Sequence, residues 1–137
     1  MTTVTTVTKP VQQPSDLSGP YWEAAARGKL VLQCCRTCGK LRHYPRLLCD
    51  GCYSDAAHWT AASGRGMVHS WTVAHHAFHP AFAAELPYVL VTVDVEEGVR
   101  ALGRWRSHCE PVLGLAAQGG FEARTGGVDL VFQARPD

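Results

Sequence analysis

The chain has 137 residues and a formal net charge of +1, with 46% hydrophobic and 18% charged residues. This length suits one small domain, or a small barrel that carries an accessory module. The near-neutral charge argues against strong general binding to nucleic acid or anionic membranes, and no apolar run reaches the ~20 residues that span a bilayer.

Residues 1–18 are rich in Thr, Gln, Pro and Ser and have no periodic apolar pattern. This composition predicts a disordered tail. The same stretch lacks the basic start and the apolar centre of a signal peptide, which favours a cytoplasmic protein.

A short docking helix is predicted within residues 19–29. Pro20 suits a first helical turn, three alanines follow it, and Gly28 can end the helix. The helix carries Tyr21 and Trp22, which either fold back onto their own domain or form a partner interface. The low content of charged residues is consistent with a surface that a partner covers.

A zinc ribbon is predicted over residues 30–62, where four cysteines follow the spacing C-x2-C-x10-C-x2-C. Each C-x2-C pair can form a tight turn that aims two thiolates at one point, and two such turns complete a tetrahedral site for zinc. Iron in a rubredoxin-like site uses the same four thiolates and is the alternative. The metal ligands are Cys35, Cys38, Cys49 and Cys52.

Three neighbouring residues bear on the ribbon. Gly39 and Gly51 are expected to give the two turns their backbone freedom. Cys34 could replace Cys35 through a C-x3-C pair, but that spacing is less regular, so Cys34 is interpreted as a neighbour of the site.

Residues 63–137 predict a five-stranded OB-type barrel, because period-two alternation and glycine turns are typical of antiparallel strands. Ser63–Gly66 reads as a turn before the first strand. That strand alternates, so its odd-numbered residues from Met67 to His75 are expected on one face. In the strand 88–95 the four valines Val89, Val91, Val93 and Val95 are likewise expected on one face. The predicted strands are 67–76, 88–95, 99–106, 121–124 and 128–134.

By these features the sequence resembles the DUF35 OB-fold proteins, which join an N-terminal helix and a rubredoxin-like zinc ribbon to an OB barrel. The resemblance implies a mainly β fold and places the four cysteines on the family's metal positions. It runs from Tyr21 nearly to the C-terminus. The stretches that carry it are YWEAAARGKLVLQCCRTCGK, YPRLLCDGC, Trp59, SGRGMVHSWTV, LPYVLVTVDVEEGVR and LVFQARP.

The resemblance implies an accessory subunit with no catalytic activity of its own. Its implied partner is a thiolase-superfamily enzyme, such as a thiolase, an aldolase of steroid side-chain breakdown or an acyltransferase, and such proteins also pair with MaoC-like hydratases. The OB face is implied to help hold an acyl-CoA. In agreement, no nucleophile motif or Gly-rich phosphate loop is present.

Two groups of residues are candidates for contact with an acyl-CoA. His75 and Phe78 lie in a His-rich loop, where binding residues are common. Arg100 and Arg104 fall on one side of a strand with Arg106, which indicates either a solvated basic face or a strip that binds the CoA phosphates.

Two other classes of function use the same modules. Zinc ribbons and OB barrels both bind nucleic acid, but the expected basic surface with interleaved aromatic residues is thin in this chain. Electron transfer would need iron at the four cysteines. The acyl-CoA accessory subunit is therefore the favoured hypothesis, with a nucleic-acid-binding module as the alternative.

Overall fold

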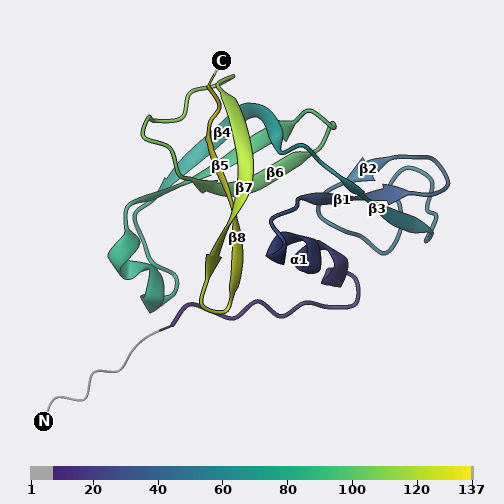
Figure 1. Ribbon diagram of the computed structural model, residues 1–137, viewed down its shortest axis with the longest axis horizontal. Coiled ribbons are helices and arrows are strands. Elements are labelled where there is room, and N and C mark those ends of the chain that lie inside the picture. Colours follow the sequence, from purple (N-terminus) through teal and green to yellow (C-terminus); the bar gives the residue numbers. More distant parts are fainter. Residues whose placement is uncertain (1–7, 137) are drawn as a thin grey trace, which may run out of the picture.

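The protein consists of one α-helix, a small three-stranded sheet and a closed five-stranded barrel (Figure 1). A computed structural model describes residues 8–136. Its helix is α1 (Gly19–Ala26), and a 3-10 helix (Pro80–Glu85) follows the first barrel strand. The strands are β1 (Val31–Cys35), β2 (Leu41–Arg42), β3 (Ala57–Ala61), β4 (Arg65–Ala74), β5 (Tyr88–Val95), β6 (Arg100–Trp105), β7 (Ala116–Arg124) and β8 (Gly127–Ala134). The predicted mainly β architecture is confirmed.

Helix α1 forms where the sequence predicts it and packs on its own chain. Pro20 lies in its first turn, and Gly28, at φ 76°, ends it while the Lys29 amide donates to the Ala24 carbonyl. Glycine adopts this left-handed conformation without the cost that a Cβ imposes. Ala24 and Ala25 are buried. In the part of the chain that the structure describes, no helix has the length and hydrophobicity needed to cross a bilayer.

The two sheets have different topologies. The ribbon sheet has the antiparallel order β2-β1-β3. The barrel has the order β4-β5-β6-β8-β7, and β7 pairs with β4 to close it. All barrel pairs are antiparallel except the short β6–β8 pair. Five strands closed in this way form an OB-type barrel.

The barrel core is a set of buried valines from β5 around the fully buried ring of Phe132. Gly103 and Gly119 make room for that ring, because a Cβ at either position would lie within 2.9 Å of it. The predicted face of β5 is thus confirmed for Val91, Val93 and Val95, which point into the core. Glycines in β6 and β7 leave the space that the Phe132 ring occupies.

The first barrel strand differs from its predicted pattern. Arg65 and Gly66 belong to β4 rather than to a turn. The register shifts between Val68 and Ser70, where a β-bulge interrupts the alternation. Residues before and after the bulge therefore do not share one face, and Trp71 pairs with the inward-facing Val91.

The N-terminal segment also differs from the predicted disordered tail where the structure describes it, while residues 1–7 lie outside the described part. The side-chain amide of Gln12 accepts from the Val128 N–H and donates to the Val128 carbonyl, as a neighbouring strand would. Lys9 pairs with Glu85 at 2.8 Å. We name residues 9–18 the N-terminal strap, because they cross from the 3-10 helix to the β7–β8 turn. This segment is held in place by side-chain pairing with residues distant in sequence, and local composition does not reveal such pairing.

Candidate functional site

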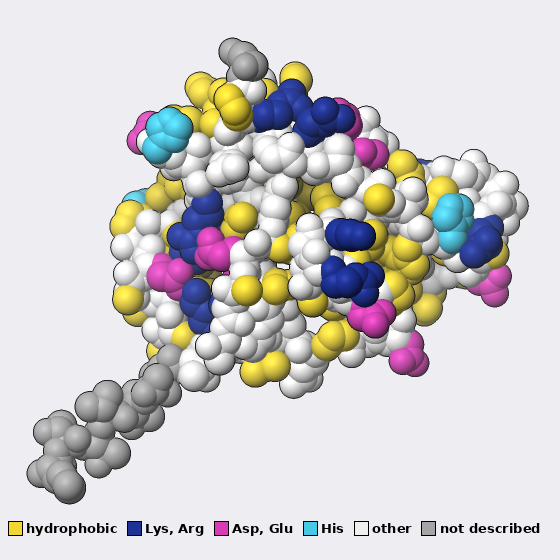
Figure 2. Space-filling model, viewed as in Figure 1, with side chains coloured by type: hydrophobic (Ala, Val, Ile, Leu, Met, Phe, Trp, Pro, Cys, Tyr) yellow, Lys and Arg dark blue, Asp and Glu magenta, His cyan; other side chains and the backbone are white. Residues whose placement is uncertain are grey.

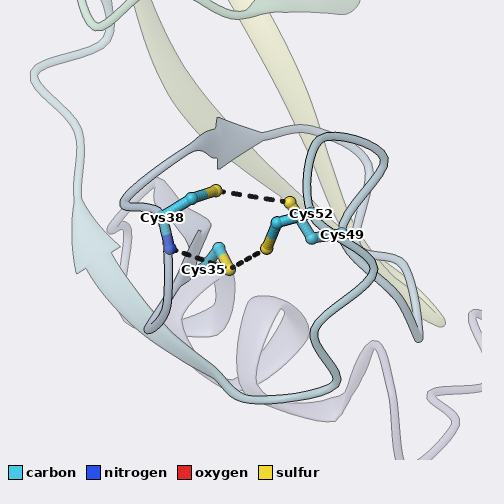
Figure 3. A group of neighbouring side chains, drawn as sticks. All are labelled: Cys35, Cys38, Cys49 and Cys52. Atoms are coloured by element: carbon cyan, nitrogen blue, oxygen red, sulfur yellow. Dashed lines mark hydrogen bonds between the residues drawn. The ribbon is translucent and has the colours of Figure 1, made fainter.

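The ribbon brings four thiols to one point, shown in Figure 3. The Sγ atoms of Cys35, Cys38, Cys49 and Cys52 all lie within 4.8 Å of one another. Cys35 and Cys52 are 3.6 Å apart at sulfur, as are Cys38 and Cys49. Four thiolates at about 2.3 Å from one zinc ion would be about 3.8 Å apart. The donor set and its spacing therefore suit a tetrahedral metal ion.

Backbone amides prepare two of these thiols for a metal. The Cys38 N–H donates to the Cys35 sulfur, and the Gly51 N–H donates to the Cys49 sulfur. The first bond lowers the pKa of Cys35 to about 6, and the second lowers the pKa of Cys49. A lower pKa favours the thiolate, which is the form that binds metals.

Each of the two C-x2-C turns is followed by a residue with a left-handed φ, but the residue type differs. Gly39 follows Cys38 at φ 77°, as its residue type suggests. In the second turn the left-handed residue is Tyr53, at φ 62°, rather than the predicted Gly51. Tyr53 is tied there by its N–H, which donates to the Cys49 carbonyl. Gly51 is not required for backbone freedom, since its φ is not left-handed, and a Cβ there would meet only ordinary contacts.

Cys34 lies outside the cluster, as its alternating position on β1 requires. Its thiol faces the carbonyl oxygens of Gly39 and Cys35. The pairing of Cys35 with Ala57 across β1 and β3 holds the first turn against the second. The regular C-x2-C spacing, rather than the C-x3-C spacing that would use Cys34, is the one whose sulfurs meet.

A second candidate site is an apolar pocket of about 570 Å³ between helix α1, the ribbon and the outer face of the barrel. Figure 2 shows hydrophobic side chains gathered between the barrel and the ribbon. Ligand pockets are commonly apolar and of this size. We name it the interdomain pocket. Its aromatic walls are Tyr21, Trp22, Tyr44, Phe82 and Tyr88, and its leucines are Leu17, Leu90, Leu102 and Leu130.

Two charged side chains line this pocket from the barrel wall, Arg104 and Asp129, and Asp129 pairs with Arg124 at 3.0 Å. The Arg104 guanidinium stacks 4.3 Å from the centre of the Tyr88 ring and donates to Glu85 at 2.7 Å. Partial burial acts to raise the pKa of Glu85, but the cations of Lys9 and Arg104 hold it below its ordinary value. Arg104 is therefore neutralised, and the pocket offers a polar edge rather than a free charge.

The other residues predicted to contact substrate lie away from the interdomain pocket. Arg100 is exposed and donates to Asp94 at 2.7 Å. His75 is exposed just after β4, and Phe78 is 92% exposed in the loop that follows. The same loop does reach the pocket, but through Phe82. Sequence reasoning missed this residue because nothing local distinguishes an inward aromatic residue from an outward one.

Tyr21 and Trp22 have different environments. Tyr21 is 7% exposed and packs edge-on against Phe121 of β7. Trp22 is partly buried and lines the interdomain pocket. Of the two residues predicted to meet a partner, only Trp22 retains appreciable surface.

His43 packs beneath the helix, with its ring 5.5 Å from the Tyr21 ring and 4.1 Å from the Tyr44 ring. Its Nε2 is buried without a hydrogen-bond partner among residues 8–136. Burial lowers the pKa of His43 to about 4 from 6.5. The imidazole is therefore kept neutral at the junction of the helix and the ribbon.

Acidification should destabilise the protein through His43. The unfolded chain takes up a proton at this residue near pH 6.5 and the folded protein only near pH 4, so stability is present above pH 6.5 and falls towards pH 4. Linkage gives a loss of about 2 kcal/mol between pH 7 and pH 5. We expect His43→Phe, which keeps the stacking but cannot titrate, to lose less stability in urea unfolding over this range.

The exposed His108 provides the matched control for this measurement. His108→Phe should retain the wild-type pH dependence. Both variants keep the same four thiols. Metal content is therefore measured at each pH, so that loss of metal can be separated from the effect of His43. A His43→Phe curve that parallels the wild-type curve would show that burial of this ring has no role in acid sensitivity.

Two family descriptions match adjacent parts of the chain. Residues 22–57 match the rubredoxin-like zinc ribbon domain of ChsH2, and residues 59–119 match the ChsH2 C-terminal OB-fold domain. The first covers the four cysteines, and the second covers most of the barrel.

Two solved structures resemble the protein over nearly its whole length. A chain of the "Ltp2-ChsH2(DUF35) aldolase" matches with a TM-score of 0.80 and 32% identity, over 90% of this chain and 98% of that chain. A protein of unknown function from the DUF35 family of Sulfolobus solfataricus matches with a TM-score of 0.60 and 11% identity, over 88% of this chain and 86% of that one. The second likeness supports the fold alone.

A curated relative from Thermomonospora curvata carries the name "Probable enoyl-CoA hydratase alpha subunit". It is 45% identical over 80 residues, which are 58% of this chain and 24% of the relative. The chain therefore spans about a quarter of the length of the curated relative it matches.

Proposed function

The chain belongs to the DUF35 family of ChsH2-type proteins, and on that premise we propose that it is an accessory subunit that holds the acyl part of an acyl-CoA for a thiolase-like enzyme. The observation that carries this proposal is the interdomain pocket. Its aromatic and leucine walls suit an apolar chain or ring system. A thioester bound there would leave its polar CoA part outside.

The proposed partner follows from the relatives. A similar chain occurs in an aldolase with Ltp2, and the curated relative is named as a hydratase subunit. We propose a thiolase-superfamily aldolase as the main partner and a MaoC-like hydratase as a second one. A steroid side-chain CoA ester is one candidate substrate, since the resemblance implies aldolases of that pathway, and palmitoyl-CoA serves as a probe for an apolar acyl chain.

The proposed role is non-catalytic. The charged groups that line the pocket are paired rather than aimed at a bound ester: Arg104 pairs with Glu85, and Asp129 with Arg124. In this role Arg104 orients the ligand through the polar edge of the pocket. His75 and Phe78 would face the partner from the exposed loop, as would Trp22 from the helix.

Zinc is the proposed metal, held by the four ribbon cysteines, with iron as the alternative. Four protein ligands leave no open position for substrate, so the ion would stabilise the ribbon rather than act in catalysis. The ribbon in turn contributes Tyr44 and Pro45 to the pocket wall. Metal binding would therefore support the pocket indirectly.

Nucleic-acid binding is disfavoured by the arrangement of charge. Arginines on and just after β6 pair with carboxylates: Arg100 pairs with Asp94, and Arg106 pairs with Glu122 at 2.8 Å. Figure 2 shows basic and acidic side chains interspersed on the visible face. A phosphate backbone would need a continuous row of unpaired cations.

The test is binding of palmitoyl-CoA to the purified chain, followed by calorimetry and by tryptophan fluorescence, to which Trp22 at the pocket wall contributes. We expect Leu102→Arg to weaken binding at least 10-fold, because it places a charge against an apolar ligand. Leu102 is accessible on the outer face of β6, so the substitution should leave the barrel folded. Free CoA should bind much more weakly than palmitoyl-CoA.

Val112→Arg is the matched control, since Val112 is an exposed apolar residue outside the pocket lining. It should bind palmitoyl-CoA as the wild type does. The isolated chain should not turn over acyl-CoA esters, whereas the complex with its partner should. Equal binding by Leu102→Arg and the wild type, or turnover by the isolated chain, would contradict the proposal.

A further inference from the structure

One edge of strand β4 is hydrogen-bonded to a neighbouring strand over only part of its length. Towards β5 it is paired from Gly66 to Ala74. On the other side, β7 pairs only with Arg65–Met67. Val68 is then bonded to the loop before β7, through the Gly114 N–H and the Leu115 carbonyl. From Ser70 to Ala74 no further backbone partner exists among the described residues, and we name this stretch the β4 edge.

Figure 1 shows β4 and β5 continuing together past the crossing with β7 towards the 3-10 helix. The β4 edge therefore projects beyond the closed part of the barrel. A row of unpaired backbone N–H and C=O groups is complementary to another extended strand, and to no other regular element.

The side chains of the β4 edge are of the kind found in strands that another segment covers, yet here two of them are exposed. Trp71 and Val73 are 40% and 42% exposed, although they pair with Val91 and Val89 on the inward face. Their exposure exists because no neighbouring strand lies over them. The edge sequence SWTVA contains no charged residue and no proline, which are the usual devices that keep a free edge from pairing.

The loop beside the edge extends this apolar surface. Val112 and Leu113 are both exposed and precede Gly114, whose N–H donates to the Val68 carbonyl. The surface therefore combines an unpaired backbone with apolar side chains on one side, and residues 70–74, 112 and 113 that form it are all uncharged.

We propose that the β4 edge is a docking site for an extended, uncharged apolar strand of the partner subunit, which adds to the barrel sheet by β-augmentation. The identity of that subunit rests on the proposed function. A second protein is favoured over a second copy of this chain because the similar ChsH2 chain is found in a complex with Ltp2. The strand would pair with Ser70–Ala74 and cover Trp71 and Val73.

The experiment uses the full chain and a thiolase-like aldolase subunit of the Ltp2 type, with their affinity measured by calorimetry. Val73→Lys places a charge on the edge without emptying the core, and we expect at least a 10-fold loss of affinity. Met67→Lys is the matched control, because Met67 is 53% exposed on the same strand but its edge is already paired with β7. Its affinity should stay within twofold of the wild type.

Hydrogen exchange gives an independent readout that does not depend on a substitution. Amides within residues 70–74 should exchange more slowly in the complex than in the isolated chain. Equal affinity of Val73→Lys and the wild type, with unchanged exchange in this stretch, would overturn the edge proposal while leaving the partner in place. A wild-type chain that fails to bind the partner would overturn the proposed function and this partner with it. If the wild-type chain self-associates and Val73→Lys abolishes this self-association, the edge binds a second copy of this chain. That outcome would overturn the proposal that a strand of the partner subunit binds there.

Discussion

Replacing Cys38 with serine is expected to release the metal and unfold the ribbon, which is the largest effect we predict for any single substitution. Binding of a structural zinc ion contributes about 10 kcal/mol or more of folding free energy in small zinc domains. Cys38 supplies one of four sulfurs that meet within 4.8 Å. Without the metal, the loop between β2 and β3 depends on hydrogen bonds and on the exposed Lys40–Asp50 ion pair, because its large apolar side chains Leu47, Leu48 and Tyr53 are exposed.

Elemental analysis of protein purified without chelator tests this expectation and separates zinc from iron. One equivalent of zinc per chain should fall to less than half an equivalent in Cys38→Ser, with faster hydrogen exchange between β1 and β3. Cys34→Ser is the control, since its thiol lies outside the cluster. Metal loss in Cys34→Ser, or retention in Cys38→Ser, would mean that the ligand set differs from the one proposed.

Substitution of Gly66 by alanine is the second large effect, and we expect it to destabilise the barrel by about 3 kcal/mol. A Cβ at this position would clash with the Asp94 carbonyl oxygen and lie 2.7 Å from a Val93 methyl carbon. The strand cannot move aside easily, because Gly66 pairs with Val95 on one side and with Ala117 on the other. The clash therefore falls at the point where the barrel closes.

Gly120→Ala provides the comparison, because Gly120 is also a strand glycine but a Cβ there would have nothing within 4 Å. Its stability should change by no more than about 0.5 kcal/mol. Urea unfolding of the two variants measures the difference directly. If Gly66→Ala were as stable as Gly120→Ala, the close approach of β4 and β5 would not be a constraint on this residue.

Local patterns predicted the parts of this protein that depend on residues near one another in sequence. The C-x2-C pairs set the direction of two thiols each, and the structure brings all four together. Pro20, the alanines and Gly28 predicted helix α1, and alternating valines predicted the inward face of β5. The DUF35 resemblance, carried by the same stretches, is confirmed.

Local patterns failed where a distant segment decides the outcome. The N-terminal strap has the composition of a disordered tail, yet Gln12 pairs with Val128 and Lys9 with Glu85. Gly66 looks like a turn residue, but it lies in a strand that is paired on both sides and crowded from the β5 side. The arginines of β6 share a side as expected, and only their carboxylate neighbours show that the strip is neutralised.

The sequence by itself therefore determined the four-cysteine cluster, the helix, most of the strands and the family of this protein, because each depends on residues near one another in the chain. Only the tertiary structure decided the interdomain pocket, the burial of Tyr21 and the open β4 edge. Those features arise from side chains and strand edges that are far apart in sequence and meet when the barrel closes. Closure of the barrel decides whether an aromatic residue lines a pocket, and it also decides whether a strand edge has a partner.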